Sequence, residues 1–464
     1  MATIFLISAN TNVEPYPVYP IGMSVIAGAL HHAGHKVIQY DMLAAGNSLE
    51  HLRKSLTSAA PDYAGISIRN VDNVDSFTSH TNKYIHKAKL IVDTVKETGI
   101  PVIAGGAGFS LLPEEILEFT GADYGIVGEG ERKMVDLISS LEQKKETPQI
   151  YGREKGIPGN EIQVPHWSPE LLRYYIAESG VINVQTKRGC EHRCGYCTYP
   201  YLEGRKMRLR PVNEVADELE MLRTYGADNI FFTDSVLNDR DGHYLQLAEE
   251  IVRRKIEISW CGFFQPGPIE QDELALLKRS GLQAMEVGTD AASDATLKGL
   301  HKSFNFAEVM RFNEKCVEQK IPCAHFVIFG GPGETMDTVR EGIKNMNSLR
   351  SCVVFPFSGI RLHEGTPLFT RAVKEGLIHP GQSLLEPFYY FSPGLDKDEM
   401  NTALIQGFKK RRDRLFPPDE GQQRINIMKK FGFRGILWDQ LIKFDDQLAN
   451  KTSSKPVTDS AYAG

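Results

Sequence analysis

Residues 187–197 read Lys-Arg-Gly-Cys-Glu-His-Arg-Cys-Gly-Tyr-Cys and place three cysteines, Cys190, Cys194 and Cys197, at C-x3-C-x2-C spacing. Three thiolates this close together can hold three irons of a [4Fe-4S] cluster and leave the fourth iron open. A cluster that only transfers electrons needs a fourth thiolate and offers no open position. The stretch therefore predicts a cluster whose fourth iron binds and reduces another molecule.

Zinc binding or a redox pair would be the alternative explanation of this spacing. Either would normally supply a fourth Cys or His at short range, and His192, inside the loop, is badly placed to be that ligand. We therefore favour the cluster. Four further cysteines lie in apolar stretches: Cys261, Cys316, Cys323 and Cys352. We expect these four to be core residues, because a free cysteine usually behaves as a small hydrophobe.

The composition limits the class of protein. A chain of 464 residues with 41% hydrophobic and 24% charged residues is ordinary for a globular enzyme of two or three domains. A net charge of −6 and a pI near 6.1 argue against a general nucleic-acid-binding surface. Because no stretch approaches the ~20 apolar residues of a spanning helix, we expect no transmembrane segment and a cytoplasmic location, where thiols stay reduced.

A local basic cluster surrounds the cysteines. Its members are Lys187, Arg188, Arg193, Arg205, Lys206, Arg208 and Arg210. Such a cluster is either a solvated face or a mouth that attracts an acidic ligand.

Residues 1–145 alternate short apolar runs with amphipathic helices, which predicts an α/β domain built on a doubly wound parallel sheet. Ligands of such sheets bind beyond the carboxyl ends of the strands, where glycine lets the backbone approach closely. The residues suited to this position are Arg69, Asn70, Gly105, Gly106, Gly108, Gly128, Glu129 and Gly130. No G-x-G-x-x-G follows the first strand, so we do not expect a nicotinamide cofactor.

The rest of the chain divides into four stretches. A linker is expected over 146–175, and residues 176–370 show six β/α units, typical of a partial parallel (β/α)6 barrel with its active site at the carboxyl ends of the strands. We expect Asp234, Gln265 and Asp290 to converge there. Residues 371–450 predict a small, mostly helical substrate or lid region whose aromatic residues either cover the cavity or form core. The polar tail 451–464 is expected to be disordered.

The cysteine loop resembles the signature of the radical SAM superfamily, whose open iron binds S-adenosylmethionine (SAM). With the preceding domain, residues 1–370 resemble the cobalamin-dependent radical SAM enzymes. The resemblance implies three cofactors: a [4Fe-4S] cluster, SAM and cobalamin. It also implies that the glycine-rich strand ends of the first domain lie beside the corrin.

The same resemblance assigns the SAM contacts. Tyr196 would lie near the adenine. Thr289 and Asp290 match a fourth-strand motif whose carboxylate contacts the ribose; the family usually has Glu there, and Asp is one methylene shorter. The backbone of Gly330, Gly331, Pro332 and Gly333 would border SAM.

One departure concerns the cobalt. Cobalamin domains that ligate cobalt use Asp-x-His-x-x-Gly, whereas Asp41 is followed by Met42 and Leu43, and none of the thirteen histidines has the required spacing. We therefore expect a cofactor without a protein histidine below the cobalt, as the resemblance implies for one that cycles between Co(I) and methyl-Co(III).

The function that these features predict is methylation of an unactivated carbon by a 5′-deoxyadenosyl radical and methylcobalamin. The alternatives are cyclisation, ring contraction or rearrangement of a lipid or natural product, and a non-catalytic cobalamin or iron–sulfur sensor. The expected partners are a small-molecule substrate, with a lipid-like one as a candidate, and an electron donor such as flavodoxin or ferredoxin. A methylthiotransferase is disfavoured because residues 1–150 contain no cysteine.

Overall fold

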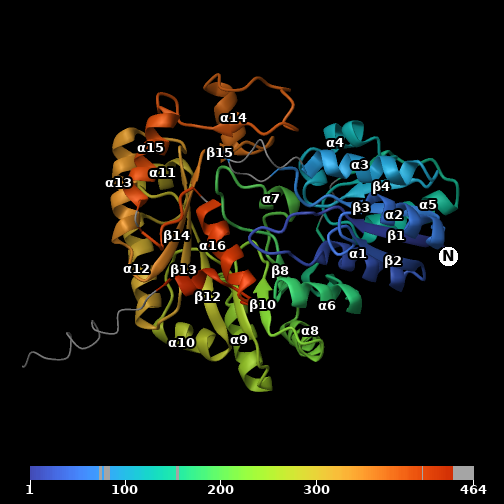
Figure 1. Ribbon diagram of the computed structural model, residues 1–464, viewed down its shortest axis with the longest axis horizontal. Coiled ribbons are helices and arrows are strands. Elements are labelled where there is room, and N and C mark those ends of the chain that lie inside the picture. The colour runs from blue at the N-terminus through green and yellow to red at the C-terminus, as the bar shows by residue number, and fades with distance from the viewer. Residues whose placement is uncertain (73–75, 78–83, 153–155, 410, 418, 443–464) are drawn as a thin grey trace, which may run out of the picture.

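The computed structural model describes residues 1–72, 76–77, 84–152, 156–409, 411–417 and 419–442. Two parallel sheets lie side by side, the first sheet in blue and cyan and the second in green to orange, with the C-terminal helices around the second (Figure 1). The expected tail, 451–464, falls outside the described residues.

The first sheet has six parallel strands in the order β2-β1-β3-β4-β5-β6. The strands are β1 (Thr3–Ser8), β2 (Lys36–Asp41), β3 (Tyr63–Ser67), β4 (Val102–Gly105), β5 (Tyr124–Ile126) and β6 (Ile150–Tyr151). The helices between them are α1 (Ile21–His32), α2 (Leu49–Ala59), α3 (Tyr84–Lys96), α4 (Pro113–Thr120) and α5 (Glu131–Glu142), with the 3₁₀ helix η1 (Phe109–Leu111). This confirms the doubly wound sheet, and the strand order reverses between β1 and β3, where such sheets bind ligands.

The stretch expected to be a linker contains regular structure. It holds β6, the 3₁₀ helix η2 (Gly159–Glu161) and the start of α6 (Pro169–Glu178), which Ser168 caps by accepting a hydrogen bond from Leu171 N. A two-residue strand at a sheet edge lacks the alternating pattern that would mark it in the sequence.

The second sheet has six parallel strands in the order β14-β13-β12-β11-β10-β7, which confirms the partial barrel. The strands are β7 (Val181–Val184), β10 (Asn229–Phe232), β11 (Ser259–Phe264), β12 (Leu282–Asp290), β13 (Cys323–Phe329) and β14 (Cys352–Ser358). The outer helices are α8 (Val212–Thr224), α9 (His243–Arg254), α10 (Gln271–Arg279), α11 (Asp294–Gly299), α12 (Phe306–Glu318) and α13 (Met336–Ser348). The cysteines lie between two short antiparallel strands, β8 (Lys187–Arg188) and β9 (Arg208–Leu209), with α7 (Tyr199–Leu202) directly after them.

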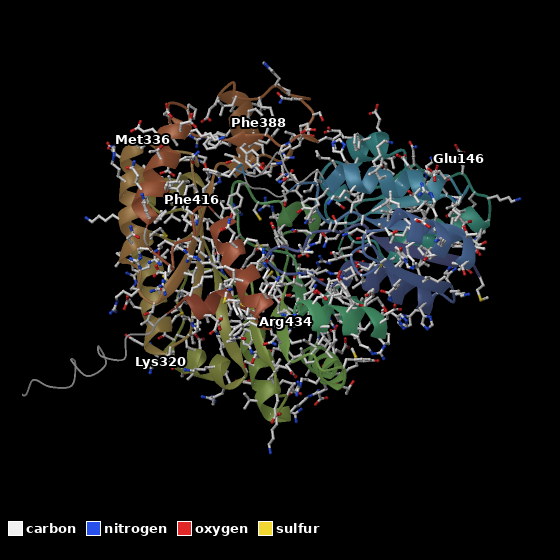
Figure 2. All side chains as sticks on the ribbon, viewed as in Figure 1. Glu146, Lys320, Met336, Phe388, Phe416 and Arg434 are labelled. Atoms are coloured by element: carbon white, nitrogen blue, oxygen red, sulfur yellow. The ribbon has the colours of Figure 1, made fainter. Side chains whose placement is uncertain are left out.

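The C-terminal region is small and mostly helical, as expected. It comprises β15 (Ile360–Arg361), α14 (Pro367–Lys374), β16 (Tyr389–Tyr390), α15 (Lys397–Phe408), α16 (Asp419–Lys430) and the 3₁₀ helix η3 (Trp438–Leu441). Phe388 lies in the part of the chain near α14, and Arg434 follows α16 (Figure 2).

Its aromatic residues have different surroundings. Tyr390 and Trp438 are buried, whereas Phe431 and Phe433 are exposed. Phe391 covers the turn at Gly330, since a Cβ there would lie 2.9 Å from the Phe391 ring.

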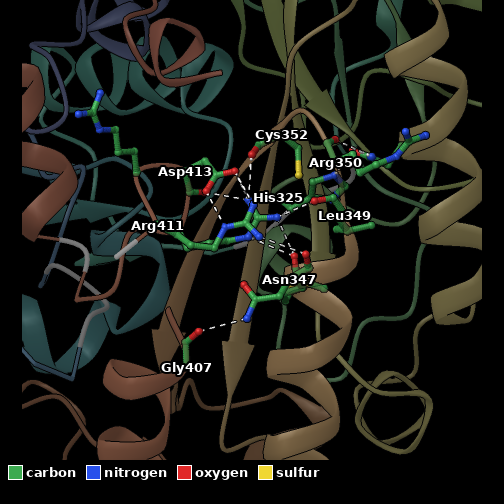
Figure 3. Close-up of polar contacts among 12 residues, drawn as sticks. His325, Asn347, Leu349, Arg350, Cys352, Gly407, Arg411 and Asp413 are labelled. Carbon is green, nitrogen blue, oxygen red and sulfur yellow. Dashed lines mark hydrogen bonds and ion pairs between the residues drawn. The ribbon is translucent and has the colours of Figure 1, made fainter. Parts of the chain in front are cut away.

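Residues near Asp413 attach this region to the barrel. Val354 N donates to Asp413 O (2.8 Å) and Leu415 N donates to Val354 O (2.9 Å), which places the segment beside β14. Arg411 forms an ion pair with Asp413 in the same group of polar contacts (Figure 3). The chain then returns through the barrel: Ile436 and Trp438 pack against Cys261, Ala284 and other inward-facing residues of the strands.

Candidate active site

The loop between β8 and β9 holds the three cysteines in place through backbone contacts. Cys190 N donates to Gly204 O (3.1 Å), Gly195 N donates to Leu300 O (2.9 Å) and Cys197 N donates to Cys194 O (3.3 Å). All three thiols are free, and among the described residues no group of three His, Cys, Asp or Glu side chains is arranged to hold a single metal ion. The Cys190 thiol raises the pKa of Cys194, and the Cys194 and Cys190 thiols raise that of Cys197, so the three cysteines lie within electrostatic reach of one another.

Burial raises the pKa of the Cys194 thiol above its usual range and that of Cys197 to about 12. A metal or cluster binds thiolates, so binding at this loop must displace protons. The donor set, three free thiols on one hairpin, fits a three-cysteine cluster site.

Asp290 and Lys302 lie against Cys194. The Lys302 ammonium donates to Asp290 Oδ2 and to Cys194 Sγ (3.3 Å). Burial alone lowers the pKa of Lys302, but Asp290 and Cys194 outweigh it and raise that pKa above its ordinary value. Loss of water, and after it the Asp290 carboxylate, raises the pKa of the half-buried Tyr196 phenol. Two of the predicted SAM residues, Tyr196 and Asp290, are thus brought together beside the cysteine loop.

Asp234 and Thr289 face elsewhere. Asp234 is fully buried and accepts hydrogen bonds from Thr186 N (2.7 Å), Thr186 Oγ1 (2.5 Å) and Lys187 N (3.2 Å), so it braces the start of the cysteine hairpin. Thr289 Oγ1 contacts His325 Nδ1 (2.8 Å) in the core. Neither side chain has a free polar group to offer a ligand at the mouth.

Gln265 and the 330–333 segment lie at carboxyl ends of barrel strands. Gln265 N donates a hydrogen bond to Asn238 Oδ1 (2.9 Å), and Gln265 Nε2 donates one to Ser303 Oγ (3.1 Å). Gly330 has φ +95° and Gly333 has φ +85°, which other residues rarely adopt. Gly330 N donates to the buried Glu334 carboxylate, whose pKa burial raises to about 7. Glu334 therefore stabilises the turn.

A cavity of about 370 Å³ lies at the carboxyl edge of the first sheet. Six of the predicted cobalamin residues line it: Arg69, Gly105, Gly106, Gly128, Glu129 and Gly130. The second domain contributes Asn183, Gln185, Arg188, Tyr199, Leu202, Glu203 and Thr233. Asn70 and Gly108 do not belong to the lining.

Glycine is required at this edge. Gly106 has φ +102°, and a Cβ there would lie 2.6 Å from Ile68 O. A Cβ added to Gly108 would lie 2.9 Å from Arg69 O. The glycines therefore keep the strand ends close together, and Gly106 also leaves part of the cavity wall without side chains. This open, glycine-lined space fits a large planar cofactor.

Arg69 is a cationic side chain in this cavity. Much of its surface is accessible, yet burial by the surrounding protein lowers its pKa, while the Tyr199 and Tyr16 phenols raise it. No histidine is among the described residues that line the cavity.

Ion pairs join the cavity to the cysteine hairpin. Arg188 Nη1 lies 2.6 Å from Glu131 Oε1, and Arg208 Nη1 donates to Glu129 Oε2 (2.9 Å). Of the predicted basic cluster, these two arginines are therefore paired with acids of the first domain. Arg210 likewise pairs with the buried Glu218 (2.8 Å).

Neither the role of Lys302 nor the ion pairs between the two domains could be predicted from the sequence. Lys302 follows Asp290 by twelve residues and matches no motif, so only the fold shows that it reaches a cysteine. A positive φ of 62° at Asp290 turns the chain at the strand end.

Two family models match the chain. The model of the radical SAM superfamily matches residues 184–345, and that of the B12 binding domain matches residues 7–138. The second range contains all eight predicted cobalamin residues, and the first contains the three cysteines.

Curated relatives share about a quarter of the sequence. Tryptophan 2-C-methyltransferase of Streptomyces laurentii is 25% identical and covers 78% of this chain and 72% of its own length. Cytidylyl-2-hydroxyethylphosphonate methyltransferase of Streptomyces wedmorensis is 24% identical, and the match covers 88% of this chain and 89% of the relative's own length. The anaerobic magnesium-protoporphyrin IX monomethyl ester cyclase of Rubrivivax gelatinosus is 22% identical over 70% of this chain and 61% of its own length.

Solved structures share the fold. The radical SAM methyltransferase TsrM of Kitasatospora setae, with cobalamin and a [4Fe-4S] cluster bound, has a TM-score of 0.81 at 23% identity and covers 95% of this chain and 97% of its own. The cobalamin-dependent radical SAM enzyme OxsB has a TM-score of 0.68 at 14% identity, over 93% of this chain and 71% of its own.

Proposed function

Because the chain belongs to the cobalamin-dependent radical SAM enzymes, with a cobalamin-binding domain and a radical SAM domain that use cobalamin, SAM and a [4Fe-4S] cluster, we propose that it methylates an unactivated carbon of a small molecule. Two of the curated relatives above are methyltransferases by name.

The observation that carries the proposal is the wall shared by the two cofactor sites. Helix α7 begins two residues after Cys197, and its Tyr199 and Leu202 line the cavity of the first domain. A cluster on the cysteines would therefore lie next to the start of the short helix that a corrin in the cavity would contact.

When bound, the cluster supplies one electron to SAM, and cobalamin supplies a methyl group that ordinary acid–base chemistry cannot place on such a carbon. Cys190, Cys194 and Cys197 would hold the cluster, and the Gly106 and Gly128 backbone would lie against the corrin. Lys302 holds Asp290 and Cys194 together beside that loop. The Glu129 and Glu131 ion pairs keep the hairpin next to the cavity.

We propose flavodoxin or ferredoxin as the electron donor and the cytoplasm as the location. None of the described helices is long and apolar enough to cross a bilayer. Candidate substrates include a lipid-like molecule, because apolar side chains such as Val181, Phe231 and Ile436 lie inside the barrel.

Cyclisation or rearrangement is the second candidate function, because one relative is named a cyclase. Both functions use the same cofactors, so only the product distinguishes them. Methyl-labelled SAM gives a labelled product in methyl transfer and an unlabelled one in cyclisation.

The test uses the full chain, reconstituted anaerobically with iron, sulfide and cobalamin. We expect about four irons per chain, release of 5′-deoxyadenosine from SAM and, with candidate metabolites, a labelled product by mass spectrometry. Replacing Cys190, Cys194 or Cys197 by Ala should abolish SAM cleavage, whereas Cys261→Ala and Cys352→Ala should not. SAM cleavage by the triple Ala variant would contradict the proposal.

A further inference from the structure

Glu286 is a carboxylate inside the barrel. Side chains alternate along a strand, and Ala284 of β12 belongs to the interior cluster, so Glu286 and Gly288 also point inward. Trp438 of the same cluster confirms the direction, since its Nε1 donates to Glu286 Oε1 (3.4 Å).

Aromatic side chains lie on the strands beside this carboxylate. Phe263 is the register partner of Glu286 on β11, and Phe326 is that of Gly288 on β13. Phe326 stacks on Phe355 with ring centroids 5.1 Å apart. Glu286 and all three phenylalanines stay partly exposed although they face the interior, so other protein atoms do not cover these side chains completely.

Glu286 lacks a cationic partner among the described residues. The one hydrogen bond that reaches its carboxylate within the described part of the chain is the long one from Trp438. Burial raises the pKa of Glu286 to about 7. A carboxylate that has lost much of its contact with water is costly unless a hydrogen-bond donor or a cation satisfies it, so this group is suited to a ligand that brings one.

Glu286 lies where a substrate would have to bind to be close to both cofactor sites. Asp290, beside the cysteine loop, lies four residues further along β12, roughly 13 Å at the rise of a strand. The first domain reaches the same place through Tyr16, whose pKa is raised by burial and by Glu286 and lowered by Arg69 of the cavity. A molecule bound to Glu286 would therefore lie below the cysteine loop and beside the cavity of the first domain.

We propose that Glu286 and the aromatic side chains around it bind an aromatic substrate that carries a nitrogen hydrogen-bond donor, such as an amine. The inference rests on the proposed function, because it names the substrate class of that same site. The ring of the substrate packs against Phe263, Phe326 and Phe355, and its nitrogen donates to Glu286. An isoprenoid chain would fill the same space but would leave the carboxylate without a donor.

Anaerobic isothermal titration calorimetry on the fully reconstituted chain tests this assignment. The probes are tryptamine, indole-3-propionate, which replaces the amine by a carboxylate, and geraniol as an apolar chain. We expect tryptamine to bind the wild type at least about tenfold more tightly than either other probe, and Glu286→Gln to weaken tryptamine binding by about tenfold or more.

Asp439→Asn is the matched control, because Asp439 is a nearby carboxylate at the base of the barrel that accepts a hydrogen bond from Gln283 (2.8 Å). It should bind tryptamine as the wild type does, and Glu286→Gln should keep the iron and corrin content of the wild type. Equal tryptamine binding by Glu286→Gln and wild type, absence of tryptamine binding to the wild type, or preference for geraniol would overturn the inference. Failure of the wild type to load corrin or cleave SAM would instead overturn the proposed function.

Discussion

At the scale of single residues, the site depends on charges that are buried in pairs. Lys302 and Asp290 are almost fully buried, with side chains 5% and 13% exposed, and each is the other's counter-ion. Breaking such a pair from one side leaves a charge without compensation, which costs far more than the pair itself contributes. The cysteine loop therefore lies against a group that is sensitive to single substitutions.

Lys302→Met should destabilise the cluster-free protein by about 3 kcal/mol, because it leaves the Asp290 carboxylate buried and unpaired. Urea unfolding followed by circular dichroism measures the change. Lys298→Met, which removes an exposed lysine of α11, should leave stability unchanged. The double variant Asp290→Asn with Lys302→Met should recover part of the loss, since neither charge remains; a double variant no more stable than Lys302→Met would contradict this explanation.

Residues with a characteristic spacing can be singled out in a sequence, whereas residues that act through a neighbouring group cannot. The three cysteines are recognisable because their spacing alone defines the cluster ligands. Asp234 was expected at the mouth from its place after a strand, but it is fully committed to the hairpin of Thr186 and Lys187. Glu286 lies four residues before Asp290 on the same strand, and its role could not be predicted, since only the closed barrel shows which way it points.

At the scale of elements, one arginine holds the C-terminal region to the barrel. Arg414 is fully buried and donates to the backbone carbonyls of Met346 (2.8 Å) and Leu349 (2.7 Å) at the end of α13, and of Cys352 (3.0 Å) at the start of β14. Helices leave their last carbonyls without partners, and Arg414 supplies the missing donors. The segment that later carries Trp438 into the barrel is anchored in this way.

Arg414→Met should lower the stability of the protein by about 3 kcal/mol, because several buried carbonyls would lose their donor at once. Limited proteolysis should also cut the C-terminal region faster than in the wild type. Arg412→Met is the control, since Arg412 is an exposed neighbour. Wild-type stability and proteolysis in Arg414→Met would show that other contacts anchor the segment.

At the scale of the whole molecule, the cavity is shared by two domains. The parallel sheet of the first domain and its glycine-rich edge could be predicted, because alternating strands and helices are typical of a doubly wound sheet. The contribution of the second domain could not, since nothing local to Tyr199, Leu202 or Glu203 indicates that these residues face another sheet. Asn70 and Gly108 were expected beside the cofactor because they follow strand ends. They do not belong to the cavity lining.

Gly105→Leu should abolish corrin binding. Gly105 lines the cavity and has no positive φ, and its added Cβ would meet Ile126 O at an ordinary 3.6 Å, so the side chain fills the cavity without straining the backbone. Corrin absorbance per chain after reconstitution measures the effect. Gly152→Leu, at a glycine with open space around it, should bind about one corrin per chain as the wild type does. Full loading of Gly105→Leu would place the corrin elsewhere.

The bound cobalt should carry no protein histidine, because no histidine is among the described residues that line the cavity. Electron paramagnetic resonance of the Co(II) form should then show no superhyperfine splitting from a protein nitrogen. Splitting that disappears when one histidine is replaced would refute this expectation.

The shared wall also constrains the order in which the protein can be assembled. The lining begins at Leu6 and ends at Thr233, and its last seven members belong to the second domain. A ribosome releases the first sheet well before those residues, so a nascent chain offers the cofactor only an open half-site. Corrin can be enclosed only after Thr233 has emerged and the hairpin has docked through Arg188 and Arg208. Maturation of this protein is therefore expected to be a late, post-folding event, and its two domains, produced as separate chains, should each fail to retain the corrin.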